Sequence, residues 1–347
     1  MSVVWKILIG LVVFGLLIFF HELGHFLLAR INKIGVEEFS LGMGPRIFSF
    51  ERKGIRYSIK ALPIGGSCMM VGEDEENDRP DAFNNQPVLR RISVVLAGPV
   101  FNFLLAFLLS IVVVAFAGVD KPVLTDTIHG LPAEAAGLQA GDKITRLNDK
   151  KITVYRDVTL YMAFYEGGDL RVCYERDGED YETVITPQYD ETYGRYMIGI
   201  QVNGAGEPVG FFETLRYAAY EVKYWISYTI TSLRLLFTGK VPVSDLSGPV
   251  GIVNMIGDTV EASSSYGFGT VLLNLASFAT LLSANLGVMN LLPIPALDGG
   301  RLLFLLIELI RRKPISREKE AWVHVAGFVL LMLLMVFILY NDIRRLF

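Results

Sequence analysis

His21-Glu22-Leu23-Gly24-His25 interrupts a long apolar run that begins at Ile7. On a helix the two histidines lie one turn apart on the same face, so their imidazoles can bind one zinc ion. The glutamate lies three residues before the second histidine, where a carboxylate can act as general base toward a zinc-activated water. Ionisable groups within an apolar spanning helix indicate a functional site. The pattern therefore predicts a catalytic metal site inside a membrane, rather than on a soluble helix with a polar face.

The composition is that of a membrane protein. Of the 347 residues, 52% are hydrophobic, and the mean hydropathy is +0.42. This is too apolar for an ordinary soluble domain and indicates several membrane spans, with the lipid bilayer as a partner. The net charge of −4 argues against nucleic-acid binding, which requires a basic face. Cys68 and Cys173 lie far apart, so neither a disulfide framework nor a cysteine metal site is predicted.

Four apolar stretches are long enough to cross a bilayer: about residues 3–29, 92–118, 271–292 and 322–340. Ten basic residues lie between the first and second stretches, and six lie between the third and fourth. Because basic loops stay in the cytoplasm, both of these segments are predicted to be cytoplasmic. Both termini and the segment from about residue 119 to 270 are then extracytoplasmic.

The first cytoplasmic segment contains an apolar, glycine-rich stretch at about residues 39–71, which predicts a β-hairpin. Irregular backbone at membrane depth is tolerated where protein covers it or where it lines a cavity. We expect the hairpin to dip into the membrane beside the metal site and to offer an edge strand to an unwound substrate. A hairpin lying on the membrane surface is the alternative.

The external segment begins with a compact globular pattern at residues 119–202. Its string Ala-Gly-Leu-Gln-Ala-Gly-Asp-Lys-Ile, at residues 136–144, is similar to that of PDZ domains. PDZ domains bind extended chain ends by strand addition, so a peptide-binding or access-filtering role is predicted. Residues 203–270 are predicted to be a linker with an amphipathic helix at about 211–237, lying at the outer membrane interface.

A catalytic zinc ion needs three protein ligands and one open position. The first and third spans run in the same direction, so their C-terminal ends meet on the cytoplasmic side. Pro293 and Pro295 end the third span there, and Asp298 is the carboxylate presented at this break. Asp298 is therefore the predicted third ligand. His324 enters the fourth span on the same side and is the weaker candidate.

Five motifs follow one another in a specific order: HExxH in the first span, AGPVFN at residues 97–102, the PDZ-like insert, LSGPVGI at 246–252, and NLLPIPALDGG at 290–300. This set covers nearly the whole chain and resembles the site-2 protease family, in particular its bacterial RseP/RasP-type intramembrane zinc metalloproteases with one PDZ domain. The resemblance implies a bacterial inner or plasma membrane protein with zinc as cofactor. One departure is the hairpin stretch Gly65–Met70, where family members often carry a tyrosine and a lysine.

The resemblance also assigns roles to residues. It implies that His21, His25 and Asp298 are the zinc ligands and that Glu22 is the catalytic base. It implies that Asn285 and Asn290 bind the substrate strand or the transition state. The small residues around Gly98, and Asn102, resemble the packing motif of the family's second span, which implies that they lie close to the active-site helix.

The predicted fold class is an α-helical polytopic membrane protein with four transmembrane helices, a membrane-associated β-hairpin and an inserted extracytoplasmic α/β PDZ-like domain. The expected division is 1–118 and 271–347 for the two halves of the membrane core, 119–202 for the PDZ-like domain, and 203–270 for the linker. The expected activity is regulated intramembrane proteolysis of pre-trimmed single-span membrane proteins, such as anti-sigma factors or remnant signal peptides. The alternatives are a non-catalytic PDZ membrane scaffold and a metal transporter that uses the His/Asp cluster as a transit site.

Overall fold

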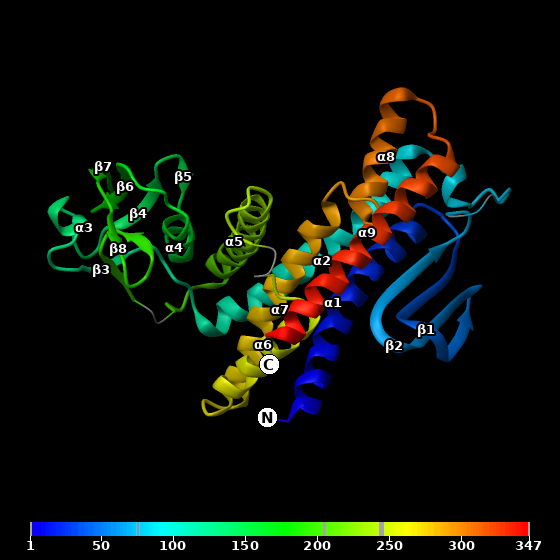
Figure 1. The fold of residues 1–347 in the computed structure, drawn as a ribbon, viewed down its shortest axis with the longest axis horizontal. Helices are drawn as coiled ribbons and strands as arrows, with labels where there is room; N and C mark the ends of the chain where they lie inside the picture. Colours follow the sequence, from blue (N-terminus) through cyan, green and yellow to red (C-terminus); the bar gives the residue numbers. More distant parts are fainter. Residues whose placement is uncertain (1, 74, 76, 204–205, 243–245, 346–347) are drawn as a thin grey trace. The chain divides into compact units, whose positions relative to one another are not determined.

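The computed structural model describes residues 2–73, 75, 77–203, 206–242 and 246–345 (Figure 1). The chain divides into two compact units. One comprises residues 1–109 together with 229–347, and the other comprises residues 110–228.

Four of the helices in the described residues are long and apolar enough to cross a membrane. They are α1 (Val3–Ile31), α2 (Val88–Ala117), α7 (Phe268–Leu291) and α9 (Arg317–Arg344). The predicted four-span fold class is therefore confirmed. Helices α2, α7 and α9 begin a few residues earlier than predicted. In α2 and α9 the reason is that the first turn is charged, as with Arg90 and Arg91 in α2, and so lies outside the apolar run.

A further helix, α6 (Pro249–Ser264), packs against α1, α7 and α9. From the sequence these residues were expected only as part of the linker, but proline is favoured in the first turn of a helix, where its missing N–H costs nothing. The buried carboxylate of Asp342 in α9 accepts the backbone N–H groups of Gly248 and Gly251, at 3.0 and 2.9 Å. These bonds satisfy helix-start donors, and the LSGPVGI motif is explained as the docking point of α9 on α6.

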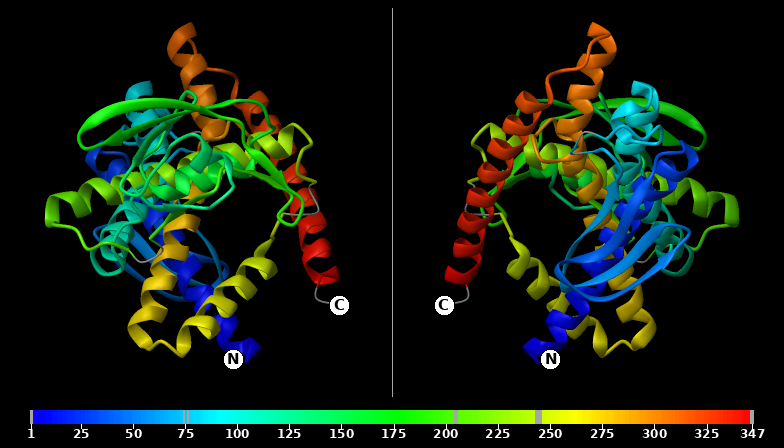
Figure 2. Two further views of the ribbon diagram at one scale, coloured as in Figure 1. Left: turned by 90° about the vertical axis from the view of Figure 1, so that its left-hand side faces the viewer. Right: turned by 90° about the vertical axis from the view of Figure 1, so that its right-hand side faces the viewer.

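The hairpin consists of β1 (Val36–Arg52) and β2 (Ile55–Met70) and lies along α1 (Figures 1 and 2). The long strands fold over, so that residues 38–41 pair with residues 56–59 on one side and with residues 66–69 on the other. Gly42 and Gly44 accommodate the bend with φ of 85° and 87°, values that side chains with a Cβ rarely adopt. The segment 66–69 is thereby placed against α1.

The second unit is an α/β domain, as the sequence predicts. Its main sheet has the antiparallel order β5-β4-β6-β7, and two smaller pairs are β10-β3 and β8-β9. Its elements are β3 (Leu124–Thr127), α3 (Pro132–Ala135), β4 (Lys143–Leu147), β5 (Lys150–Lys151), α4 (Tyr155–Ala163), β6 (Leu170–Arg176), β7 (Glu179–Ile185), β8 (Gln188–Asp190), β9 (Arg195–Met197) and β10 (Ile200–Val202).

The PDZ-like string at residues 136–144 forms two turns and a buried ion pair within this unit. Gly137 and Gly141 have φ of 80° and 93° and make the turns on either side of Leu138, which enters the core. Asp142 is fully buried and forms a two-point ion pair with Arg176, with Oδ1 2.6 Å from Nε and Oδ2 2.7 Å from Nη2. The remaining linker helix, α5 (Phe211–Phe237), has the bounds that the sequence predicts.

Candidate metal centre

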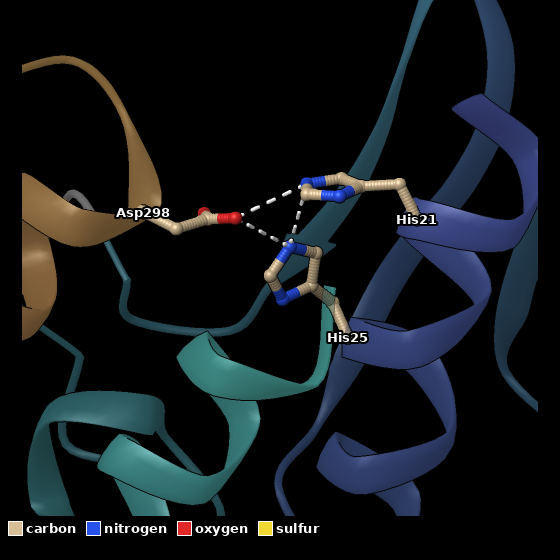
Figure 3. Close-up of side chains that lie close together, drawn as sticks. All are labelled: His21, His25 and Asp298. Carbon is tan, nitrogen blue, oxygen red and sulfur yellow. Dashed lines mark hydrogen bonds and ion pairs between the residues drawn. The ribbon is translucent and has the colours of Figure 1, made fainter. Parts of the chain in front are cut away.

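Three side chains from two distant parts of the chain converge at one point (Figure 3). His21 and His25 project from adjacent turns of α1, and Asp298 begins helix α8 (Asp298–Arg311). The Nε2 atoms of the histidines lie 3.2 Å apart, and Asp298 Oδ2 lies 3.1 and 3.4 Å from them. His25 is buried and the other two side chains are largely shielded from solvent.

These residues fit a zinc ion. Zinc binds imidazole nitrogen and carboxylate oxygen at about 2.0–2.2 Å, so the ligand atoms of a tetrahedral site lie about 3.3 Å apart. The observed separations fall around this value. Asp298 Oδ2 is buried, yet among the described residues no donor meets it with hydrogen-bond geometry. Three acceptors that face one another in this way indicate a cation site, and three protein ligands leave one position open for catalysis.

Helix α2 closes the back of the site. A Cβ on Gly98 would lie 2.3 Å from His25 Nε2 and 2.7 Å from His21 Cε1, so only glycine leaves room for both rings. A Cβ on Gly24 would lie 2.4 Å from the carbonyl oxygen of Ala97, which shows how closely α1 and α2 approach. The AGPVFN motif therefore supplies the wall against which the imidazoles rest.

The centre opens into a cavity of about 540 Å³. Glu22 lines this cavity together with both histidines and Asp298, and its carboxylate lies near the Cys68 backbone. A Cβ on Gly66 would lie 2.9 Å from Glu22 Cγ, so glycine allows the hairpin to pass directly over the glutamate. Strand residues 66–70 form one wall of the cavity.

The structure brings most of the predicted site residues together. His21, Glu22, His25 and Asp298 share the cavity, and Asn290 on α7 also lines it. Asn285 is half-buried on α7, and the described cavity-lining residues do not include it. His324 lies outside the cluster.

His324 instead holds the proline loop, because its Nδ1 accepts the backbone N–H of Ala296 at 2.9 Å. Ala296 has a positive φ of 76° and lies two residues before Asp298. Sequence reasoning had missed this contact. It had placed Gly98 and Asn102 close to the active-site helix, but it had not predicted that they contact the imidazoles. The small-residue spacing of AGPVFN was the available signal.

The family model of peptidase family M50 matches residues 9–334. The chain belongs to peptidase family M50. A relative from Clostridium acetobutylicum, whose name places it among the zinc metalloproteases, is 38% identical over 98% of this chain and 97% of that protein. The zinc metalloprotease RasP of Bacillus licheniformis is 34% identical over 97% of this chain and 98% of that protein.

The M50 relative from Bacillus subtilis, regulator of sigma-W protease RasP, is 33% identical over 97% of this chain and 98% of its own. Among solved structures, the PDZ domain of an SdrC-like protein from Listeria monocytogenes is 21% identical, with a TM-score of 0.22 over 24% of this chain and 87% of that chain. The protein is thus a multi-pass membrane zinc metalloprotease of the site-2 protease type within M50.

Proposed function

We propose that this protein hydrolyses peptide bonds within the transmembrane segments of single-span membrane proteins. The observation that carries the proposal is the shared cavity, in which three convergent ligand atoms, the Glu22 carboxylate and a hairpin strand meet among apolar helices. His21, His25 and Asp298 would hold the zinc ion. When bound, zinc supplies Lewis acidity toward the scissile carbonyl and lowers the pKa of water toward neutrality.

Glu22 serves as the general base in this proposal. Its carboxylate accepts the proton of the attacking water and later returns it to the leaving amine. The Cys68 backbone lies beside the carboxylate on the hairpin side, and α1 fixes Glu22 one residue from His21. The base is thereby kept at the metal without occupying a ligand position.

The substrate must unwind locally, because the carbonyl groups of a helix are already hydrogen-bonded. We propose that the unwound segment lies along strand residues 66–70 and pairs with that strand by strand addition. Asn290 lines the same cavity from α7, which supports a hydrogen bond from it to this segment, and we assign Asn285 the same role from the family resemblance. Single-span proteins already trimmed outside the membrane, such as anti-sigma factors or remnant signal peptides, suit this route. The name of the Bacillus subtilis relative, a regulator of sigma-W, supports the first of these substrate classes.

The test uses the full-length protein and a single-span substrate reconstituted together in vesicles, with cleavage sites mapped by mass spectrometry. Glu22→Gln is expected to retain zinc and to slow cleavage within the span by roughly 10²–10⁴-fold, the usual contribution of a general base. Glu37→Gln is the matched control, because Glu37 lines the same cavity but is solvent-exposed. Cleavage by Glu22→Gln at the wild-type rate would refute the proposal.

A further inference from the structure

The two imidazoles of the centre differ in how their second ring nitrogen is held. His25 Nδ1 lies 2.9 Å from the carbonyl oxygen of Val94 in α2. A carbonyl only accepts hydrogen bonds, so Nδ1 of His25 carries the ring proton, and Nε2 keeps the lone pair that faces Asp298. The α2 backbone therefore fixes His25 in the tautomer that binds a metal.

The corresponding nitrogen of His21 faces a side chain that can either donate or accept. Asn102 is fully buried on α2, and its amide nitrogen lies 3.0 Å from His21 Nδ1. Asn102 Oδ1 is also buried and has no hydrogen-bond partner in the part of the chain that the structure describes. A half-turn of the carboxamide exchanges the positions of these two atoms.

Only one of the two amide orientations is compatible with a metal on His21. If the amide nitrogen donates to Nδ1, the ring proton lies on Nε2, which faces His25 and Asp298 and then has no lone pair for a metal. If Oδ1 faces Nδ1 instead, it accepts a hydrogen bond from Nδ1–H and gains the partner that it otherwise lacks. Nε2 is then free to bind the metal.

We propose that Asn102 is a positioning residue whose amide oxygen holds His21 in the Nδ1–H tautomer and thereby sets the zinc affinity of the centre. The inference rests on the proposed function, in which His21 is a zinc ligand. Partners that orient a ligating histidine in this way typically contribute 10–100-fold to metal affinity. Asn102 also lies one helical turn after Gly98, so one face of α2 supplies both the space and the hydrogen bond for the imidazoles.

The test measures the zinc affinity of the purified full-length protein by competition with a chelator. Asn102→Leu removes the acceptor at similar volume and is expected to weaken zinc binding by roughly 10–100-fold. Asn102→Asp supplies an oxygen that can only accept, and is expected to bind zinc at least as tightly as the wild type. Ser110→Ala is the matched control, because Ser110 is buried on the same helix and its hydroxyl has no described partner.

The visible spectrum of the cobalt-substituted protein separates loss of the hydrogen-bond acceptor from loss of packing, because the acceptor is restored in Asn102→Asp. It is expected to change in Asn102→Leu and to return in Asn102→Asp. Wild-type affinity in Asn102→Leu would overturn the inference. Weak zinc binding by Asn102→Asp would also overturn it. This second result decides the question even if Asn102→Leu does not fold.

His21→Ala separates this inference from the proposed site. If His21→Ala still binds one zinc ion as tightly as the wild type, His21 is not a ligand and the proposed site itself is wrong. If His21→Ala loses zinc while Asn102→Leu keeps it, only the role of Asn102 is wrong.

Discussion

Close backbone approach sets the dimensions of the centre at the scale of single residues. The ring atoms of His21 and His25 lie where a side chain on Gly98 would otherwise be, and the hairpin passes over Glu22 at Gly66. Interiors are packed densely enough that one added methyl group must displace its neighbours. Glycine on α2 and on β2 therefore leaves the space that the two imidazoles and Glu22 occupy.

Gly98→Ala is predicted to move the imidazoles and to lower zinc affinity by more than about tenfold, similar to the loss of a partner that orients a metal ligand. Zinc content after dialysis against a chelator is the measurement. Gly15→Ala is the control, because among the described residues, apart from its chain neighbours and its own helix backbone, no atom lies within 4 Å of a Cβ on Gly15 of α1. Equal zinc retention by Gly98→Ala and Gly15→Ala would contradict the proposed packing.

At the scale of elements, the hairpin is stabilised by a buried carboxylate as well as by the backbone pairing of its strands. Glu38 is 3% exposed and forms a two-point ion pair with Arg46, with both N–O distances 2.8 Å, while Ser58 donates to it at 2.6 Å. The hydrogen bonds from Arg46 are the main reason that the pKa of Glu38 falls from 4.5 to about 2. The network joins the two halves of the folded-over sheet.

This lowered pKa predicts a pH-dependent hairpin. Because the folded-state pKa lies below the unfolded value, the stabilisation is fully present above pH 4.5 and is lost as the pH falls toward about 2. The rate of pepsin cleavage within residues 36–70 is therefore expected to rise steeply between pH 4.5 and 2.5, beyond the change in pepsin's own activity on an unfolded peptide.

Glu38→Gln is expected to destabilise the hairpin near neutral pH by about 1–3 kcal/mol and to remove most of this acid sensitivity. Glu51→Gln provides the comparison, because the Glu51–Arg56 pair of the same hairpin is exposed and contributes little. An acid transition that persists unchanged in Glu38→Gln would show that another group controls it.

The same elements show what the sequence could and could not predict. The four spans, the hairpin and the pairing of His21 and His25 with Asp298 follow from apolar length, helical spacing and the proline break. Helix α6 was missed because its N-cap Gly248 and first residue Pro249 have the composition of a loop. Asp342, 94 residues after Gly248, accepts the backbone N–H groups at this helix start. Contacts of this kind are set by tertiary packing, which local sequence does not encode.

At the scale of the whole molecule, the proposed orientation places the basic segments in the cytoplasm and the PDZ-like unit outside. Two exposed positions are predicted to lie on opposite sides of the membrane: Asp177, in the turn after β6, and Lys313, in the segment after α8. In a variant with Cys68 and Cys173 replaced by alanine, a membrane-impermeant maleimide is expected to label Asp177→Cys in intact cells. Lys313→Cys is expected to react only after permeabilisation, and the opposite pattern would reverse the proposed topology.

The central claim is that two distant parts of the chain complete one zinc site. X-ray absorption at the zinc edge, together with the zinc-to-protein ratio, tests it most directly. The wild type is predicted to bind one zinc ion with two imidazoles and with oxygen completing its ligand set. His25→Ala is predicted to lose imidazole scattering or the metal, and Asp298→Ala to lose the metal or an oxygen ligand. Unchanged zinc binding and an unchanged spectrum in Asp298→Ala would contradict the account.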